Sequence, residues 1–351
     1  SEAPPPKPRR HTGQYNRDAC DLMKHKLLAG MACLALATSA CATPTTAPAP
    51  TDAAAPQASG WDQYVKTTID KWLAIDPAFA VYEGAHEYDG KLADWSEAGL
   101  KAKGEFLRSI IADAGNFDGL TPQQAFERDY MVQVAKGQLF WLEDADQPHT
   151  NPEYYINGGL DPNVYVSRNY TDKATRMKAM IAFFKAVPEA AQHIRANLKT
   201  PMPESFAKLG TDAFAGYADY YRGDARAAFA DVEDPALQAE FKETSEAAGA
   251  AMQDLADWLA EVPTNQDYAL GADRFSRMLA STEAVDISLD KLEAVGRADL
   301  KKNREALVAA CAQFAPGKTV PECVEKMGAD KPEDGPVAEA RRQIPELVSF
   351  V

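Results

Sequence analysis

The feature that most constrains the fold is a series of helix-start signals in the part of the chain that begins at Trp61. At each start, an Asp, Ser or Thr that can cap a helix precedes a run of helical period, and in three cases a proline follows. These starts are Asp76-Pro77, Thr121-Pro122, Asp234-Pro235 and Ser288. Apolar residues also recur at spacings of three and four, as at Trp61, Val65, Ile69 and Trp72. The sequence therefore predicts a mainly α fold, built as an array of many helices.

Further helices are predicted along most of the chain after residue 61. Their ranges are 96–114, 121–142, 171–187, 188–198, 203–229, 234–261, 271–279 and 288–314. Extended backbone is predicted only for 154–156 and 164–166, within a connection rich in Pro, Gly and Asn. At most a short β-hairpin is therefore expected. The sequence shows no repeat of fixed period, which argues against a solenoid.

Residues 23–40 have the pattern of a bacterial lipoprotein signal peptide. Met23 and the basic segment 24–26 precede the apolar run 27–37, and small residues lead to Cys41. The apolar run is too short to cross a bilayer. We expect Cys41 to become the lipid-modified N-terminus, so that the membrane is a partner and the protein faces the periplasm from the outer membrane. Release as a soluble periplasmic protein stays open, because Thr38 stands where a Leu is usual.

The sequence divides the rest of the chain into three segments. Residues 1–22 precede the signal and are interpreted as a leader or a misassigned start. Residues 41–60 are rich in Ala, Pro and Thr and are predicted to form a tether, because they cannot bury enough apolar surface to fold. Residues 61–351 are predicted to form a helical domain that is truncated at its C-terminus. We therefore expect exposed apolar surface near residues 337–351.

The charge balance bears on the choice of partner. The chain has 37 Lys and Arg against 52 Asp and Glu, which gives a formal net charge of −15 at pH 7. This negative field repels phosphate backbones. No nucleic-acid partner is therefore expected.

Histidines are the natural candidates for metal chemistry, and three of them lie in the helical domain. His86-Glu87 begins like a zinc-protease helix, but the second His that would share its face is replaced by Gly90, and the surroundings indicate a turn. His149 could line a cleft or be an ordinary loop residue, and His193 is interpreted as a surface or helix-contact residue. No pair has ligand spacing, so the sequence assigns no catalytic, cofactor-binding or metal-binding residue in this segment.

Other catalytic patterns are also missing from the sequence. It contains no Gly-x-Ser-x-Gly elbow, phosphate-binding glycine loop or dinucleotide fingerprint. The tyrosines 217, 220 and 221 lie at helical spacing and are interpreted as core or as the wall of a cleft. A second stripe is interpreted as core, and it contains Met177, Met180, Ile181 and Phe184.

Cys311 and Cys323 are the cysteines that remain after the signal region. They lie twelve residues apart, near the end of one predicted helix and the start of the next. In an oxidising compartment they could form a disulfide that closes a helix corner. Two separately buried thiols are the alternative.

Several stretches together resemble the bacterial domain-of-unknown-function 885 family. The resemblance covers about residues 61–307 and is carried by motifs whose order and spacing match. These motifs are Asp76-Pro77-Ala78-Phe79-Ala80-Val81-Tyr82-Glu83-Gly84, His86-Glu87-Tyr88-Asp89-Gly90-Lys91-Leu92, Trp95-Ser96, Asn151-Pro152-Glu153-Tyr154-Tyr155, residues 176–188, Arg195-Ala196-Asn197-Leu198 and Leu270-Gly271-Ala272-Asp273-Arg274-Phe275. The resemblance implies an exported helical lipoprotein similar to zincin-type peptidases, with this chain as the N-terminal half of a helical bowl.

The zinc site that the resemblance implies requires a His-Glu-x-x-Pro-Gly-His motif, which this sequence lacks. We therefore expect the N-terminal scaffold of an exported zinc-dependent peptidase-like lipoprotein, with a peptide as substrate and zinc bound only by the full-length protein. This segment alone is expected to be inactive. The alternative is a non-catalytic envelope lipoprotein that binds peptides or a protein partner. A purely structural spacer is a third interpretation, but it does not explain the many helices.

Overall fold

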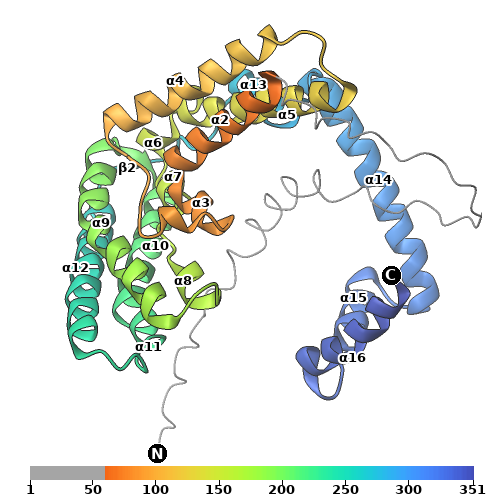
Figure 1. The fold of residues 1–351 in the computed structure, drawn as a ribbon. Helices are drawn as coiled ribbons and strands as arrows, with labels where there is room; N and C mark the ends of the chain where they lie inside the picture. The colour runs from red at the N-terminus through yellow and green to blue at the C-terminus, as the bar shows by residue number, and fades with distance from the viewer. Residues whose placement is uncertain (1–59) are drawn as a thin grey trace, which may run out of the picture. The chain divides into compact units, whose positions relative to one another are not determined.

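The computed structural model describes residues 60–351. The segments interpreted as leader, signal peptide and tether lie outside the described residues, as does Cys41, except that Gly60 begins the first described helix. The elements are α2 (Gly60–Ile75), α3 (Pro77–Tyr82), η1 (His86–Tyr88), α4 (Glu97–Asp113), η2 (Ala114–Asn116), α5 (Pro122–Leu139), η3 (Phe140–Asp144), α6 (Gln147–Thr150), α7 (Glu153–Ile156), α8 (Asn163–Ser167), α9 (Lys173–Asn197), β1 (Met202–Pro203), α10 (Glu204–Arg222), α11 (Asp224–Ala227), α12 (Pro235–Ala260), β2 (Thr264–Asn265), α13 (Ala272–Glu283), α14 (Leu289–Phe314), α15 (Val320–Ala329) and α16 (Gly335–Phe350) (Figure 1). The predicted mainly α fold is confirmed. Among the described helices, none has the length and apolar character needed to span a membrane.

The predicted helix starts are confirmed by their caps. The Asp76 side chain accepts a hydrogen bond from the backbone N–H of Phe79, and Asp234 accepts from two N–H groups of the first turn of α12. Thr121 forms a capping box with Gln124, in which each side chain bonds the other residue's backbone. Ser288 caps α14 in the same way as Asp76 caps α3. Local cap chemistry therefore sets where these helices begin.

The prediction of extended backbone at 154–156 and 164–166 is wrong. Both stretches are short helices, α7 and α8, because Asn151 and Asp161 accept hydrogen bonds from the N–H groups two residues later and so start a helical turn. The strands that are present are β1 and β2, which pair in parallel with Met202 opposite Thr264. Because the pair is parallel, it is not the short hairpin that the sequence allowed.

The predicted break between helices at Val187 and Pro188 is also wrong. The structure has one helix, α9, which continues through Pro188. Proline normally interrupts a helix because it removes a hydrogen bond. Here the buried side of α9 continues on both sides of the proline with Phe184, Val187 and Ile194. Packing of this face against α12 therefore outweighs the local preference of proline.

The main core lies among α9, α10 and α12, which pack side by side (Figure 1). Phe184 of α9 contacts Phe241 of α12 and Tyr221 of α10, with ring centroids 5.6 and 5.1 Å apart. The side chains predicted as a core stripe are all buried, and they are Met177, Met180, Ile181 and Phe184. A second group of helices packs around α5, which contacts both α4 and α13.

The C-terminal helices have their own small buried cluster. Cys311, Ala315 and Cys323 are buried together where α14 meets α15. The structure places a disulfide between the two cysteines, with an S–S distance of 2.07 Å and a Cα–Cα distance of 5.7 Å. This bridge joins the end of α14 to α15.

The corner between α14 and α15 can be tested through this bridge. In the denatured, unreduced mature protein, we expect Cys311 and Cys323 to be unreactive toward thiol reagents and to be found as a linked peptide pair by mass spectrometry. Reduction should lower the free energy of unfolding by about 3 kcal/mol, since the bridge closes a short loop in the unfolded chain. Urea unfolding followed by circular dichroism would measure this loss. A double variant, Cys311→Ser with Cys323→Ser, should not respond to reductant, and two reactive thiols at these positions would contradict the prediction.

Candidate functional site

The irregular connection between α5 and α9 contains His149, and tyrosine side chains fix its position. Tyr155 donates a hydrogen bond to the carbonyl oxygen of Pro148 over 2.6 Å, and Tyr221 donates to that of Leu160 over 2.5 Å. Burial raises the pKa of both tyrosine hydroxyls above the usual value. These hydroxyls therefore stay protonated as donors and satisfy carbonyl groups that regular secondary structure would otherwise satisfy.

The tyrosine cluster predicted as core or cleft wall packs against this connection. Tyr221 is fully buried, and Tyr217 donates to the carbonyl oxygen of Ile156 over 3.1 Å. Tyr220 lies 3.5 Å from Oδ1 of Asn163, and burial raises its pKa. The three rings therefore belong to the core that supports α7 and α8.

Two buried polar side chains of α9 complete this support. Arg176 donates from Nη1 to the carbonyl oxygen of Tyr165 over 2.8 Å. Asn197 donates from Nδ2 to the carbonyl oxygen of Trp95 over 2.7 Å and to the hydroxyl of Tyr155 over 2.9 Å. Because Arg176 and Asn197 are both buried, loss of either would leave backbone carbonyls without a partner.

His149 lies in α6, and both of its ring nitrogens face carboxylates. Nδ1 is 2.5 Å from Oδ1 of Asp146, and Nε2 is 3.0 Å from Oε1 of Glu97 at the start of α4. Lys199 reaches the second oxygen of Asp146 over 3.2 Å. Both ring nitrogens of His149 therefore lie within hydrogen-bond distance of carboxylate oxygens that the protein itself supplies.

The turn that leads to His149 has an unusual backbone. It begins with the π-helical turn η3, and Asp146 then has a φ of 50°, in the left-handed region that is unfavourable for residues with a Cβ. Glu143 pairs with Arg108 of α4, and Asp144 lies 3.0 Å from Arg277 of α13. The acidic side chains of this turn therefore contact several elements, although each exposed ion pair contributes little stability.

His86 lies in η1, in a turn as predicted. Its Nδ1 is 3.1 Å from Oδ1 of Asp89, and its ring stacks on that of Tyr170 with centroids 3.5 Å apart. Tyr170 donates to the other oxygen of Asp89 over 2.8 Å, and burial together with this bond raises the pKa of Tyr170. The turn also requires glycine at Gly90, where φ is +77° and a Cβ would come within 2.5 Å of the Cβ of Ala182.

His193 lies on α9, with Nε2 3.8 Å from Oε1 of Glu189. Each of the three histidines considered in the sequence thus lies within 4 Å of at least one carboxylate oxygen. Among residues 60–351, no three His, Cys, Asp or Glu side chains are grouped so that they could hold a metal ion. A zinc site therefore does not fit the described side chains, and we derive no catalytic step through zinc.

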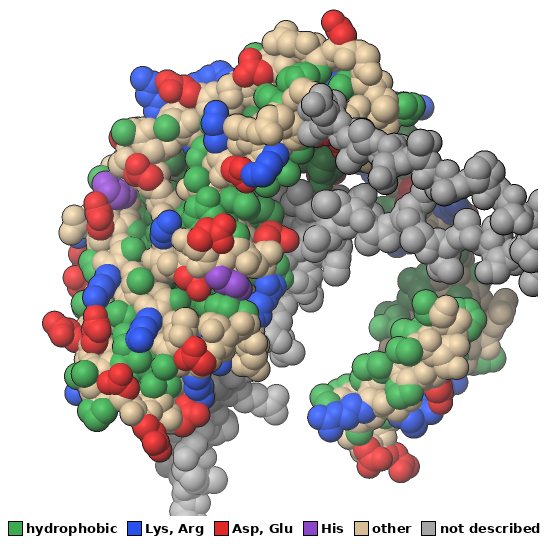
Figure 2. All heavy atoms as spheres, in the orientation of Figure 1, with side chains coloured by type: hydrophobic (Ala, Val, Ile, Leu, Met, Phe, Trp, Pro, Cys, Tyr) green, Lys and Arg blue, Asp and Glu red, His purple; other side chains and the backbone are tan. Residues whose placement is uncertain are grey.

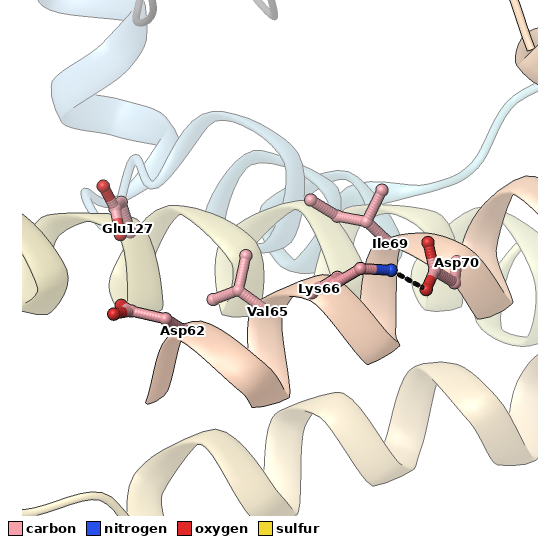
Figure 3. Close-up of a pocket in the computed structure, with 6 residues that line it drawn as sticks. All are labelled: Asp62, Val65, Lys66, Ile69, Asp70 and Glu127. Atoms are coloured by element: carbon pink, nitrogen blue, oxygen red, sulfur yellow. Dashed lines mark hydrogen bonds and ion pairs between the residues drawn. The ribbon is translucent and has the colours of Figure 1, made fainter. Parts of the chain in front are cut away.

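The pocket in Figure 3 lies between α2 and α5 and has a volume of about 300 Å³. It is lined by Asp62, Val65, Lys66, Ile69, Asp70 and Glu127. Lys66 bonds to Asp70 over 2.7 Å, Asp62 accepts from Gln124, and Glu127 accepts from Trp61. Each of these carboxylates therefore has a partner within the protein. The bonds of Asp62 and Glu127 join α2 to α5.

The sequence did not reveal the partners of these histidines. Glu97 and His149 are separated by 52 residues, and only the fold brings them together. The sequence also did not indicate that the ring of Tyr170 stacks on that of His86. The turn at Gly84, Asp89 and Gly90 was the local signal that could be found.

The buried tyrosines predict a loss of stability at alkaline pH. Burial raises the pKa of Tyr165 from 10.0 to about 12, so the unfolded chain loses this proton first and the stabilisation is lost as the pH rises from about 10 through about 12. Tyr165→Phe should weaken this dependence. At pH 8 the same variant should lower the free energy of unfolding by about 1–3 kcal/mol, because the N–H of Gly90 loses its buried acceptor. Urea unfolding at pH 8, 10 and 11 measures both effects, and an unchanged pH dependence in the variant would refute the assignment.

Comparison with known proteins supports the family resemblance found in the sequence. A model of the family described as bacterial protein of unknown function (DUF885) matches residues 77–351. No curated protein matches the chain. A solved structure, that of a putative lipoprotein of unknown function from Shewanella oneidensis, is similar with a TM-score of 0.67 and 18% sequence identity, over 84% of this chain and 57% of that one. This likeness shows a shared fold, and the chain spans 57% of the length of that protein. By its match over most of its length, the chain belongs to the bacterial DUF885 family.

Proposed function

We propose that this chain is the helical scaffold of an exported, lipid-anchored, peptidase-like protein whose zinc-binding residues lie outside residues 1–351. The observation that carries the proposal is the shared fold with a longer lipoprotein, of which this chain spans 57%. Membership in the DUF885 family supports it. Within this proposal, a peptide is the substrate class.

The packing and hydrogen bonds among the described residues support the scaffold role. The helices α9, α10 and α12 share one buried core, and their side chains fix the connection that contains η3, α6, α7 and α8. His86 and His149 are bound to carboxylates and act as structural links. We assign no catalytic role to any described residue.

The export part of the proposal rests on the sequence of residues 23–41. It has a basic start, a short apolar run and a cysteine after small residues, and the similar structure is described as that of a putative lipoprotein. Lipid on Cys41 would attach the protein to the membrane. The proposed location is the outer membrane, with the protein facing the periplasm. Release as a soluble periplasmic protein is the competing outcome.

Lipidation is tested by expressing the chain from Met23 in bacteria supplied with labelled palmitate. We expect label on the wild-type protein, which should partition into detergent, and no label on a Cys41→Ser variant. Cys33→Ser is the matched control, since it lies within the apolar run of the signal and should keep the label. A wild-type protein that is exported, soluble and unlabelled would show that it is released instead.

Catalysis is tested by comparing this chain with the product of the reading frame continued past the codon for Val351. The continued product should bind about one zinc per chain and hydrolyse peptides, and this chain alone should do neither. Hydrolysis by this chain, with zinc bound at His86, His149 or His193, would overturn the proposal. A reading frame that stops at Val351 would favour the alternative, a non-catalytic lipoprotein that binds peptides or a partner.

A further inference from the structure

The helix α14 has one apolar side that the described part of the chain leaves uncovered. Among its 26 residues, Cys311 is the one that is buried. The exposed fractions of Leu300, Leu307 and Phe314 are 58%, 45% and 47%. These residues and Leu292 are seven or eight positions apart, which corresponds to two turns, so they lie on one side of the helix. We call this set of four residues the α14 stripe.

The other sides of α14 contain ion pairs within the helix, together with Val295 and Val308, which are 51% and 56% exposed. Arg297 pairs with Glu293 over 2.6 Å, and Lys301 pairs with Glu305 over 3.9 Å. Asn303, which donates to Asp299 over 2.9 Å, lies on the side of the stripe, between Leu300 and Leu307. Such pairs stabilise a solvated helix surface, but they give no reason for leucines to recur on one side. An amphipathic helix of this kind normally buries its apolar side against another layer.

The following helices repeat the pattern. Figure 2 shows hydrophobic side chains, in green, on the surface of the segment that Figure 1 labels α15 and α16. On α16 the exposed apolar residues are Val337, Ile344, Leu347, Val348 and Phe350. This agrees with the exposed apolar surface expected near residues 337–351. Soluble proteins rarely leave contiguous apolar surface of this kind uncovered.

We propose that the α14 stripe is the docking surface for a helical layer of the same polypeptide that lies beyond residue 351. This inference rests on the proposed function. The argument for this occupant is length, because the similar fold is longer and this chain spans 57% of it. The occupant also has to be long enough to cover α14, which is about 39 Å long at 1.5 Å per residue. A second copy of this chain is the competing occupant.

The test measures the accessibility of single positions in the intact gene product and in this chain alone. Leu300→Cys and Leu307→Cys place a thiol on the α14 stripe. Ala298→Cys is the matched control, since Ala298 is exposed and points away from the stripe by helical geometry. The rate of reaction with a thiol reagent is followed by site-resolved mass spectrometry, which separates these positions from the native cysteines.

In this chain alone, the three variants should react at similar rates. In the intact gene product, Leu300→Cys and Leu307→Cys should react at least about tenfold more slowly, while Ala298→Cys keeps its rate. Equal rates at all three positions in the intact product would overturn the inference. Protection of the stripe in this chain alone that grows with protein concentration would also overturn it, because a second copy would then be the occupant.

These outcomes are independent of catalysis. A protected stripe in an intact product that binds no zinc and cleaves no peptide would leave the docking surface standing and remove the proposed function. An active product with an unprotected stripe would support the proposed function and contradict the docking surface. Circular dichroism on each variant checks that the helix content is unchanged, which is expected because all three side chains are solvent-exposed.

Discussion

The arrangement of this protein depends on side-chain hydrogen bonds that satisfy the backbone of an irregular connection. A buried carbonyl without a partner costs about 1–3 kcal/mol, so a connection packed against a helical core needs donors from that core. Tyr221 of α10 and Arg176 of α9 supply such donors to Leu160 and Tyr165, and Tyr155 within the connection donates to Pro148. Because these donors are themselves buried, they fix the position of the connection relative to the helices around it.

These hydrogen bonds also explain the environment of the histidines. Pro148 accepts from Tyr155, and its neighbour His149 is therefore held where Asp146 and Glu97 can reach its ring. Through these contacts His149 links α6 to the start of α4. The contacts of these histidines are thus contacts within the fold.

What could be predicted from the sequence was the local part of the fold. Caps such as Asp76 and Thr121 act within a few residues, and a core stripe such as that of Phe184 is written in a single helix. Contacts between distant residues could not be predicted. The bond of Asn197 to Trp95 spans 102 residues, and the continuity of α9 through Pro188 depends on packing against α12. Propensity is a weak guide wherever tertiary packing decides.

The helices α9 and α14 differ in how much of their apolar side the described part of the chain buries. Both helices are long and begin at a side-chain cap, Asp172 in α9 and Ser288 in α14. The residues of α9 find partners on α10 and α12, so its apolar side contributes to the main core. On α14, Leu300 and Leu307 remain exposed, and the buried cluster of this region is limited to the disulfide corner. Since apolar burial is the main source of folding free energy, this difference between α9 and α14 is the physical basis of the docking surface proposed on α14.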